Sequence, residues 1–300
     1  METRQKTINL FSGSRRLTTL LMATAASLFS LVETNGAGPI DTPIDFTEYS
    51  DVYYVSQVTG SDTVGDGSLE NPWASVIAAL EGAGLAKADS RAAILVSQGR
   101  YTGPTFALRP YVDLYGGFAS PGGQRDIYTH SSILDGEDRR RILLGSDNAR
   151  LDGFRLSNGR VHGKGAALLC DGTSPTIANC LFEYNRTLIP KNWDPILIHE
   201  TAHDGGAVMV LNGAAPLIEN NVFYRNSTEC GRGGALAADR RAFPEIIGNV
   251  FSGNIAGTYD PMRSSDGGAV SIFDWSGGVF KENVVVANRS LTENDAGGVF

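Results

Sequence analysis

Short apolar runs, each interrupted by glycine, proline or asparagine, dominate the second half of the chain. A Gly-Gly-Ala-aliphatic sequence opens each unit of this pattern, and a Phe-x-x-Asn sequence closes it. The openings begin at Gly205, Gly233 and Gly267, and a looser copy begins at Gly165. Apolar runs of this length between turn-forming residues are typical of strands, and no helical period is sustained across them. The pattern therefore predicts an all-β repeat.

The spacing inside each unit is fixed, whereas the distance between units varies. Counted from the glycine before the alanine, position 12 is apolar in every copy: Ile177, Ile218, Ile246 and Phe280. Position 20 is always asparagine: Asn185, Asn226, Asn254 and Asn288. Successive units are 41, 28 and 34 residues apart. Fixed units joined by connectors of unequal length predict the stacked coils of a solenoid, with loops that leave at one corner.

Stacking of the units places equivalent residues of successive coils above one another. The apolar residues then form a continuous column, so Ile218 is expected next to Ile246. The position-20 asparagines form a second column, in which each side-chain amide can hydrogen-bond to the next. A third column, at position 15, contains Cys180, Asn221, Asn249 and Asn283.

The first half of the chain predicts less regular coils and a cap. Short strands are expected at residues 52–56, 92–96, 111–117, 133–136, 141–144 and 151–156. Residues 75–86 place Val76 and Leu80 on one helical face. We expect this N-terminal cap helix to cover the open end of the solenoid, which otherwise exposes unpaired backbone. The predicted solenoid spans residues 49–300 as one domain and, because Phe300 lies inside a new unit, is expected to continue beyond it.

The first 37 residues have the order expected of an export signal. Basic residues ending in Arg15-Arg16 precede an apolar stretch, and small residues up to Gly38 follow it. The apolar stretch is short for a membrane span, and no other stretch is long enough to cross a bilayer. We therefore interpret residues 1–37 as a signal peptide and residues 38–48 as a linker. We expect an exported protein that resides in the periplasm, at the cell surface or outside the cell.

The charge balance narrows the range of partners. The 300 residues include 33 acidic and 25 basic side chains, which gives a net charge of −8. An acidic surface argues against nucleic acid and against non-specific adhesion to anionic lipid or polyanionic sugar. It does not exclude a local basic cleft.

The three cysteines, Cys170, Cys180 and Cys230, are too few for a disulfide framework. Cys170 and Cys180 lie in one coil and can pair. Burial as small apolar side chains is the interpretation that we favour.

The repeat resembles that of the chlamydial polymorphic outer-membrane proteins, which combine Gly-Gly-Ala-[Val/Leu] with Phe-x-x-Asn. The order of Tyr-Tyr-Val-Ser at 53–56, Asn-Pro-Trp at 71–73, Gly-Arg-Tyr-Thr-Gly at 99–103 and Leu-Tyr-Gly-Gly at 114–117 is similar to the wider pectin-lyase-like class. The resemblance covers residues 52–300 and implies a right-handed parallel β-helix. That class includes polysaccharide lyases, hydrolases, adhesins and passenger domains, so the resemblance implies a fold and leaves the function open.

Two long connectors predict a binding site. Residues 186–205 and 255–267 leave the same corner of neighbouring coils, and long loops on a rigid scaffold often carry binding residues. They combine aromatic rings, which stack on a sugar face, with carboxylates and amides, which bind hydroxyl groups. The candidate binding residues are Trp193, Asp194, His199, Glu200, His203, Asp204, Tyr259, Asp260 and Arg263. We expect a polysaccharide, a cell-surface glycan or a partner surface to bind there.

One motif suggests zinc. His199-Glu200-Thr201-Ala202-His203 matches H-E-x-x-H, in which two histidines on one helical face hold Zn²⁺ and the glutamate is the general base. A helix between Pro195 and Gly205 would have only about two turns. No third ligand is obvious, since Glu219 lies in a predicted strand. A zinc-dependent hydrolase is therefore a distant alternative.

A polysaccharide lyase or glycoside hydrolase is the nearer enzymatic alternative. That chemistry needs a carboxylate pair, or Ca²⁺-binding acids with a nearby basic residue. Arg240-Arg241, before Phe243, can supply the basic residue, but no pair of acidic residues occupies positions of the repeat that would stack beside them. Asp62, Asp66 and Glu70 can hold Ca²⁺, although a solvated loop is the interpretation that we favour.

Overall fold

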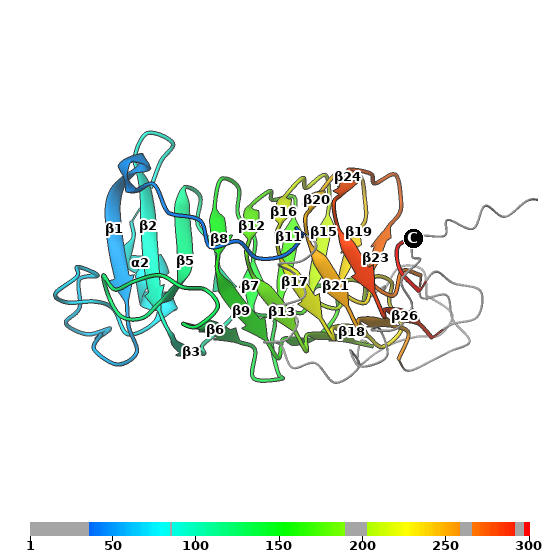
Figure 1. The fold of residues 1–300 in the computed structure, drawn as a ribbon, viewed down its shortest axis with the longest axis horizontal. Coiled ribbons are helices and arrows are strands. Elements are labelled where there is room, and N and C mark those ends of the chain that lie inside the picture. Colours follow the sequence, from blue (N-terminus) through cyan, green and yellow to red (C-terminus); the bar gives the residue numbers. More distant parts are fainter. Residues whose placement is uncertain (1–35, 85, 190–202, 259–265, 292–296) are drawn as a thin grey trace, which may run out of the picture.

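The computed structural model describes residues 36–84, 86–189, 203–258, 266–291 and 297–300. In these ranges the strands named below pair in parallel and form four sheets of eight, seven, six and five strands. Each coil of the chain visits the sheets in turn, so that successive coils add one strand to each sheet. Figure 1 shows the result as an elongated stack of coils that runs from β1 to β24 and β26. The predicted all-β parallel solenoid is confirmed.

The eight-stranded sheet contains β1 (Tyr49–Val55), β2 (Arg91–Ser97), β5 (Val112–Phe118), β8 (Arg150–Asp152), β12 (Thr176–Ala178), β16 (Leu217–Glu219), β20 (Glu245–Ile247) and β24 (Val279–Lys281). The seven-stranded sheet contains β3 (Gly99–Tyr101), β6 (Ser132–Asp135), β9 (Phe154–Ser157), β13 (Leu181–Glu183), β17 (Val222–Tyr224), β21 (Val250–Ser252) and β25 (Val284–Val286).

The five-stranded sheet follows in each coil and contains β10 (Arg160–His162), β14 (Arg186–Leu188), β18 (Ser227–Thr228), β22 (Ile255–Ala256) and β26 (Arg289–Ser290). The six-stranded sheet completes the coil and contains β4 (Phe106–Ala107), β7 (Leu143–Leu144), β11 (Leu168–Asp171), β15 (Val208–Leu211), β19 (Leu236–Ala238) and β23 (Val270–Ile272).

The apolar columns that the repeat predicts fill the interior. Ile218 pairs in register with Ile246, as expected, and both side chains are fully buried. The rings of Phe182, Phe223 and Phe251 stack face to face, with 4.7 Å between neighbouring centroids. Because each column runs through several coils, the core is continuous along the solenoid axis.

The two predicted asparagine columns are hydrogen-bonded ladders. In the first, Asn185 donates from Nδ2 to Oδ1 of Asn226 over 3.0 Å, and Asn226 donates in the same way to Asn254 over 3.0 Å. In the second, Asn221 donates to Asn249 over 3.0 Å. The Oδ1 atom of each acceptor also receives a main-chain N–H, so these buried amides are satisfied on both sides.

The cap helix is present but shorter than predicted. Helix α2 spans Val76–Gly82, and the Ser75 hydroxyl accepts the N–H of Ala78 as its N-cap. Its buried side chains pack into the core at the first coils. The predicted strand 151–156 is two strands, because Gly153 has a φ of 76° and turns the chain from β8 into β9.

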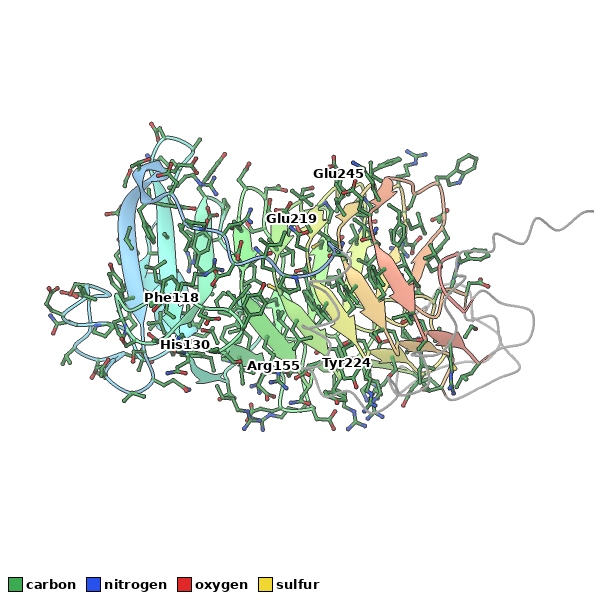
Figure 2. The ribbon with its side chains drawn as sticks, viewed as in Figure 1. Phe118, His130, Arg155, Glu219, Tyr224 and Glu245 are labelled. Atoms are coloured by element: carbon green, nitrogen blue, oxygen red, sulfur yellow. The ribbon has the colours of Figure 1, made fainter. Side chains whose placement is uncertain are left out.

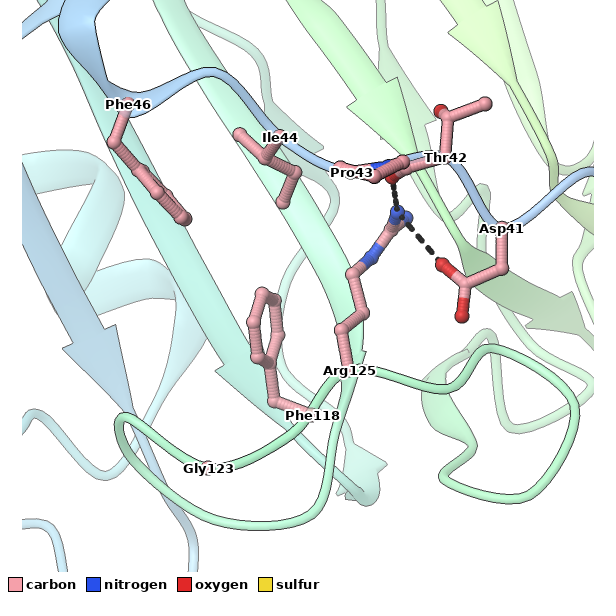
Figure 3. A pocket seen from close by; sticks show the side chains of 8 residues that line it. All are labelled: Asp41, Thr42, Pro43, Ile44, Phe46, Phe118, Gly123 and Arg125. Atoms are coloured by element: carbon pink, nitrogen blue, oxygen red, sulfur yellow. Dashed lines mark hydrogen bonds and ion pairs between the residues drawn. The ribbon is translucent and has the colours of Figure 1, made fainter.

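Residues 36–48, which we name the strap, run along the outside of the coils. The strap follows the corner between the eight- and seven-stranded sheets and enters β1 through the short helix η2 (Phe46–Glu48) (Figure 1). The segment expected as a linker thus contacts the solenoid along its length. A pocket with a volume of about 320 Å³ lies between the strap and the side chains of Phe118 and Arg125. Figure 3 shows the residues that line it.

Cys170 and Cys180 are free thiols, so the possible pair between them does not form, and Cys230 is only partly buried, contrary to the burial expected of all three. Cys170 and Cys180 are fully buried, as the favoured interpretation predicts, and burial raises the pKa of the Cys180 thiol to about 12. In the ranges that the structure describes, no helix is long and apolar enough to span a bilayer.

Candidate functional site

The predicted loop corner is only partly described. Trp193, Asp194, His199, Glu200, Tyr259, Asp260 and Arg263 lie outside the described residues. The strands that lead into the connectors are described: Arg186 of β14 pairs with Ser227 of β18, which pairs with Ile255 of β22. The two long connectors therefore start from one edge of the solenoid, on coils that are separated by the coil of β18.

His203 and Asp204, the two candidate residues that the structure describes, lie in the interior. Their exposed fractions are 3% and 0%. The main-chain carbonyl of His203 accepts the hydroxyl of Thr187 over 2.5 Å, and Asp204 Oδ1 accepts the N–H of Arg232 over 2.8 Å. These contacts fix the chain where the long connector rejoins the coil at Gly205.

The Asp204 carboxylate has an unusual electrostatic environment. Lys164 Nζ lies 3.9 Å from Oδ2 and Arg232 Nε lies 3.8 Å from Oδ1. Burial raises the pKa of Asp204, and the nearby Arg232 and Lys164 cations oppose that rise. Oδ2 has no hydrogen-bond donor among the described residues. Lys164 also reaches Asp239 Oδ2 over 3.2 Å, so one ammonium group lies between two carboxylates.

The described residues contain no group of three or more histidine, cysteine or acidic side chains placed to hold a metal ion. His199 and Glu200 of the H-E-x-x-H motif lie outside them. Asp62 Oδ1 accepts the main-chain N–H groups of Ala74 and Ser75, and Asp66 Oδ1 accepts that of Ser68. Two of the three acids considered for Ca²⁺ therefore serve as hydrogen-bond acceptors within their own loop.

Paired acids, which the sequence did not reveal, lie on the outer face of the eight-stranded sheet. Asp113 of β5 binds the Tyr49 hydroxyl and Arg91, and Asp152 of β8 binds Arg125 over 2.5 Å. Asp152 also pairs with Arg150 and accepts the side-chain amide of Asn179. Each carboxylate oxygen already has at least one partner, so this network serves to hold the sheet and the strap together.

Arginines are aligned on the outer face of the five-stranded sheet. Arg160 of β10 lies directly opposite Arg186 of β14 in the parallel register, and Arg289 occupies the same column three coils further on. Neighbouring strands are about 4.8 Å apart, and like charges in direct register repel each other. We name Arg160, Arg186, Arg225 and the adjacent Tyr184 the arginine row.

Tyr184 and Arg225 enter this row from a strained turn. Both occupy the residue before a ladder asparagine, with φ values of 54° and 52°, and Gly253 occupies the same position in the next coil. A left-handed backbone costs a non-glycine residue about 1 kcal/mol. Tyr184 is 47% exposed, and the Arg225 guanidinium lies over the Tyr224 ring at 5.0 Å. The turn therefore holds a tyrosine and an arginine outward where glycine would be strain-free.

The row is locally positive in an acidic protein. Arg155 pairs with Glu183 and Arg160 pairs with Asp138 at 3.1 Å, whereas Arg186 and Arg225 have no carboxylate partner in the part of the chain that the structure describes. Figure 2 labels Arg155 and Tyr224 along one side of the solenoid, and Glu219 and Glu245 along the other.

The sequence contains a signal for this row. Arg186 and Arg289 directly follow the ladder asparagines Asn185 and Asn288. Residues at the same offset from the ladder asparagines of different units lie in one column. Arginine at position 21 of two units therefore predicts that both side chains lie on the same face of the solenoid.

Comparison with known families agrees with the geometry. The family described as right handed beta helix region matches residues 142–300, more than half of the chain. The chain therefore belongs to the right-handed β-helix family. A search of curated proteins and a search of solved structures returned no match.

Proposed function

We propose that this protein is an exported β-helix protein that binds an acidic glycan, a polysaccharide with carboxylate or sulfate groups, along the arginine row. The observation that supports this most directly is the in-register placement of Arg160 and Arg186 on adjacent strands, in a chain of net charge −8. Repulsion between such neighbours destabilises the fold, and the Asp138 carboxylate offsets it only at Arg160. A polyanion bound along the row would offset that repulsion.

The residue types suit this ligand. The guanidinium group is planar and presents parallel N–H donors that match a carboxylate or a sulfate. Tyr184, about half exposed beside the row, offers a ring on which a sugar face can stack. Parallel strands space the arginines along the solenoid axis, and a linear polymer with repeated anionic groups is the complementary shape. The net negative charge elsewhere disfavours non-specific attachment of the same polymer.

The candidate residues Trp193, Asp194, His199, Glu200, Tyr259, Asp260 and Arg263 lie outside the described residues, and in this proposal they remain candidates for further contacts with the glycan. His203 and Asp204 hold the chain where the first long connector rejoins the coil. Among the described residues, Asp138 pairs with Arg160 of the row, and Glu183 is held by Arg155 and by the Ser157 hydroxyl. Acids occupied in this way favour binding over catalysis.

The test is a binding titration of the purified protein with polygalacturonate and chondroitin sulfate, with neutral dextran as the control polymer. We expect binding to the two acidic polymers only, weakened by added salt. Arg186→Gln and Arg225→Gln should each weaken binding about tenfold. Arg241→Gln is the matched control, because Arg241 is exposed at a different corner.

Two results would count against the proposal. One is binding of dextran as tight as that of the acidic polymers. The other is equal affinity of the Arg186→Gln and Arg241→Gln proteins. Formation of unsaturated oligosaccharides, followed by ultraviolet absorbance in the same incubation, would replace the binding function with that of a polysaccharide lyase.

A further inference from the structure

A lysine lies between two buried acids beside the six-stranded sheet. Lys164 precedes β11, Asp204 precedes β15 and Asp239 follows β19. Lys164 Nζ lies 3.2 Å from Asp239 Oδ2 and 3.9 Å from Asp204 Oδ2. The exposed fractions of the three side chains are 19% for Lys164, 0% for Asp204 and 8% for Asp239. One amine thus lies within ion-pair distance of two carboxyl groups in a place that solvent barely reaches.

The outer face of the six-stranded sheet makes these surroundings apolar. Met209 of β15 pairs in register with Ala237 of β19, and both side chains are fully buried in a cluster outside the main core. Asp239 follows Ala237 by two residues, so the two side chains lie on the same face. Lys164 and Asp239 belong to the coils of β11 and β19, which are separated by the coil of β15. Their ion pair therefore connects two coils across a nearly dry surface.

The third member of the group, Asp204, is suited to hold a proton. Its Oδ1 accepts the N–H of Arg232 over 2.8 Å, whereas its Oδ2 is buried without a hydrogen-bond partner in the part of the chain that the structure describes. Burial raises the pKa of Asp204, and the Arg232 and Lys164 cations oppose that rise. Because Oδ1 accepts the Arg232 N–H, the protonated form carries its proton on Oδ2, the oxygen that faces Lys164.

We propose that Lys164 and Asp239 condense into an isopeptide bond, which links the coils of β11 and β19 covalently, with Asp204 as the proton donor. The lysine amine becomes a nucleophile when it gives a proton to a carboxylate. Nζ then bonds to Cγ of Asp239, Asp204 donates its proton to the departing oxygen, and the nitrogen returns a proton to Asp204. One ammonium and one carboxylate thus become one amide and one water. The proposal is independent of export and of glycan binding.

The geometry favours this reaction in two ways. Groups that are held in contact react as if they were present at very high concentration, and Lys164 Nζ already contacts the carboxylate of Asp239. Condensation also replaces two charges that are poorly solvated with a neutral amide. Arg240 Nε lies 3.9 Å from Asp239 Oδ2, where it stabilises the negative charge that remains on this carboxyl group during the attack.

The test is mass spectrometry of the purified protein after digestion with trypsin. We expect a branched peptide in which the segment that contains Lys164 is joined to the segment Gly233–Arg240, with a mass one water below the sum of the two. Trypsin cannot cut after the modified lysine, so Gly165 stays attached to it. Recovery of both segments only as separate peptides, after long incubation at neutral pH, would overturn the proposal.

Variants distinguish this bond from other losses of water. Lys164→Arg keeps the positive charge but cannot form the amide, so we expect no branched peptide from it. Asp204→Asn removes the proton donor, and the cross-linked fraction should grow about a hundredfold more slowly after synthesis. Lys281→Arg is the matched control, because Lys281 is an exposed lysine paired with Glu282, and it should leave the cross-link unchanged.

Two outcomes with these variants would contradict the proposal. One is a loss of water from the original protein that persists in Lys164→Arg, which would assign it to a different reaction. The other is cross-linking of Asp204→Asn as fast as that of the original protein, which would exclude Asp204 as the proton donor.

Discussion

Asn226 donates from its side-chain Nδ2 to Oδ1 of Asn254 over 3.0 Å, and both side chains are fully buried. Asn226 also donates to the carbonyl of Phe182 and accepts from Asn185 through Oδ1. One amide therefore connects three successive coils. Each buried group left without its partner costs about 1–3 kcal/mol.

We predict that Asn226→Leu lowers the free energy of unfolding by about 3 kcal/mol, because the neighbouring amides lose their donor and their acceptor at once. Urea unfolding followed by circular dichroism measures the change. Asn71→Ala is the control, since Asn71 lies exposed in a loop. A loss for Asn226→Leu no larger than that for Asn71→Ala would show that the ladder does not stabilise the coils.

A second prediction concerns the aromatic column. The Phe223 ring stacks between Phe182 and Phe251, with 4.7 Å between centroids on each side. Phe223→Ala leaves a cavity that the rigid strands cannot close, so we expect a loss of about 3–5 kcal/mol in the free energy of unfolding. Phe243→Ala should cost less than about 1 kcal/mol, because Phe243 is half exposed. Similar losses in the two variants would exclude the column as a main source of stability.

The columns and ladders could be predicted from sequence because the repeat fixes them. When strands stack in register, residues at one offset from the unit start must meet, and this holds whatever the length of the connectors between them. Ile218 with Ile246 and Asn226 with Asn254 are therefore encoded by spacing alone. The strand boundaries were less predictable, since single turn residues such as Gly153 divide a continuous apolar run into two strands.

The strap and the acid network could not be predicted in this way. Ile40 binds Asn179 across 139 residues of chain, and no repeat relates the two positions. Asp113 and Asp152 lie in early coils whose spacing is irregular, so their adjacency depends on pairing of β5 with β8. Contacts of this kind follow from the folded path of the chain and leave no periodic signal in the sequence.

A third prediction concerns pH. Burial raises the pKa of Asp204 in the folded protein above its value in the unfolded chain. The folded state then binds the proton more tightly, so this group contributes its stability at acid pH and loses it as the pH rises through the raised pKa. Asp204→Asn keeps an oxygen that can accept the Arg232 N–H but cannot ionise.

We therefore expect the stability of the original protein, relative to Asp204→Asn, to fall as the pH is raised from acid to neutral. Urea unfolding of both proteins over that pH range measures the difference. Asp138→Asn, a substitution at an exposed ion pair with Arg160, is the control. A difference between the original protein and Asp204→Asn that is constant with pH, or that rises with it, would contradict a raised pKa.

The last prediction concerns the strap. Arg125 donates from Nη1 to Asp41 and to the carbonyl of Thr42 (Figure 3). It also donates from Nη2 to Asp152. The Arg125 side chain is 9% exposed, so its removal leaves the carboxylates of Asp41 and Asp152 without this partner. We expect Arg125→Ala to release the strap, so that a protease cuts within residues 36–48 about ten times faster. A tenfold increase corresponds to a decrease of about 1.4 kcal/mol in the free energy of local opening. Mass spectrometry of the early fragments measures this, and Arg139→Ala, at an exposed ion pair with Glu137, is the control. Early cuts distributed evenly over the chain, or a strap cut no faster than in Arg139→Ala, would show that Arg125 stabilises the whole solenoid without holding the strap in particular.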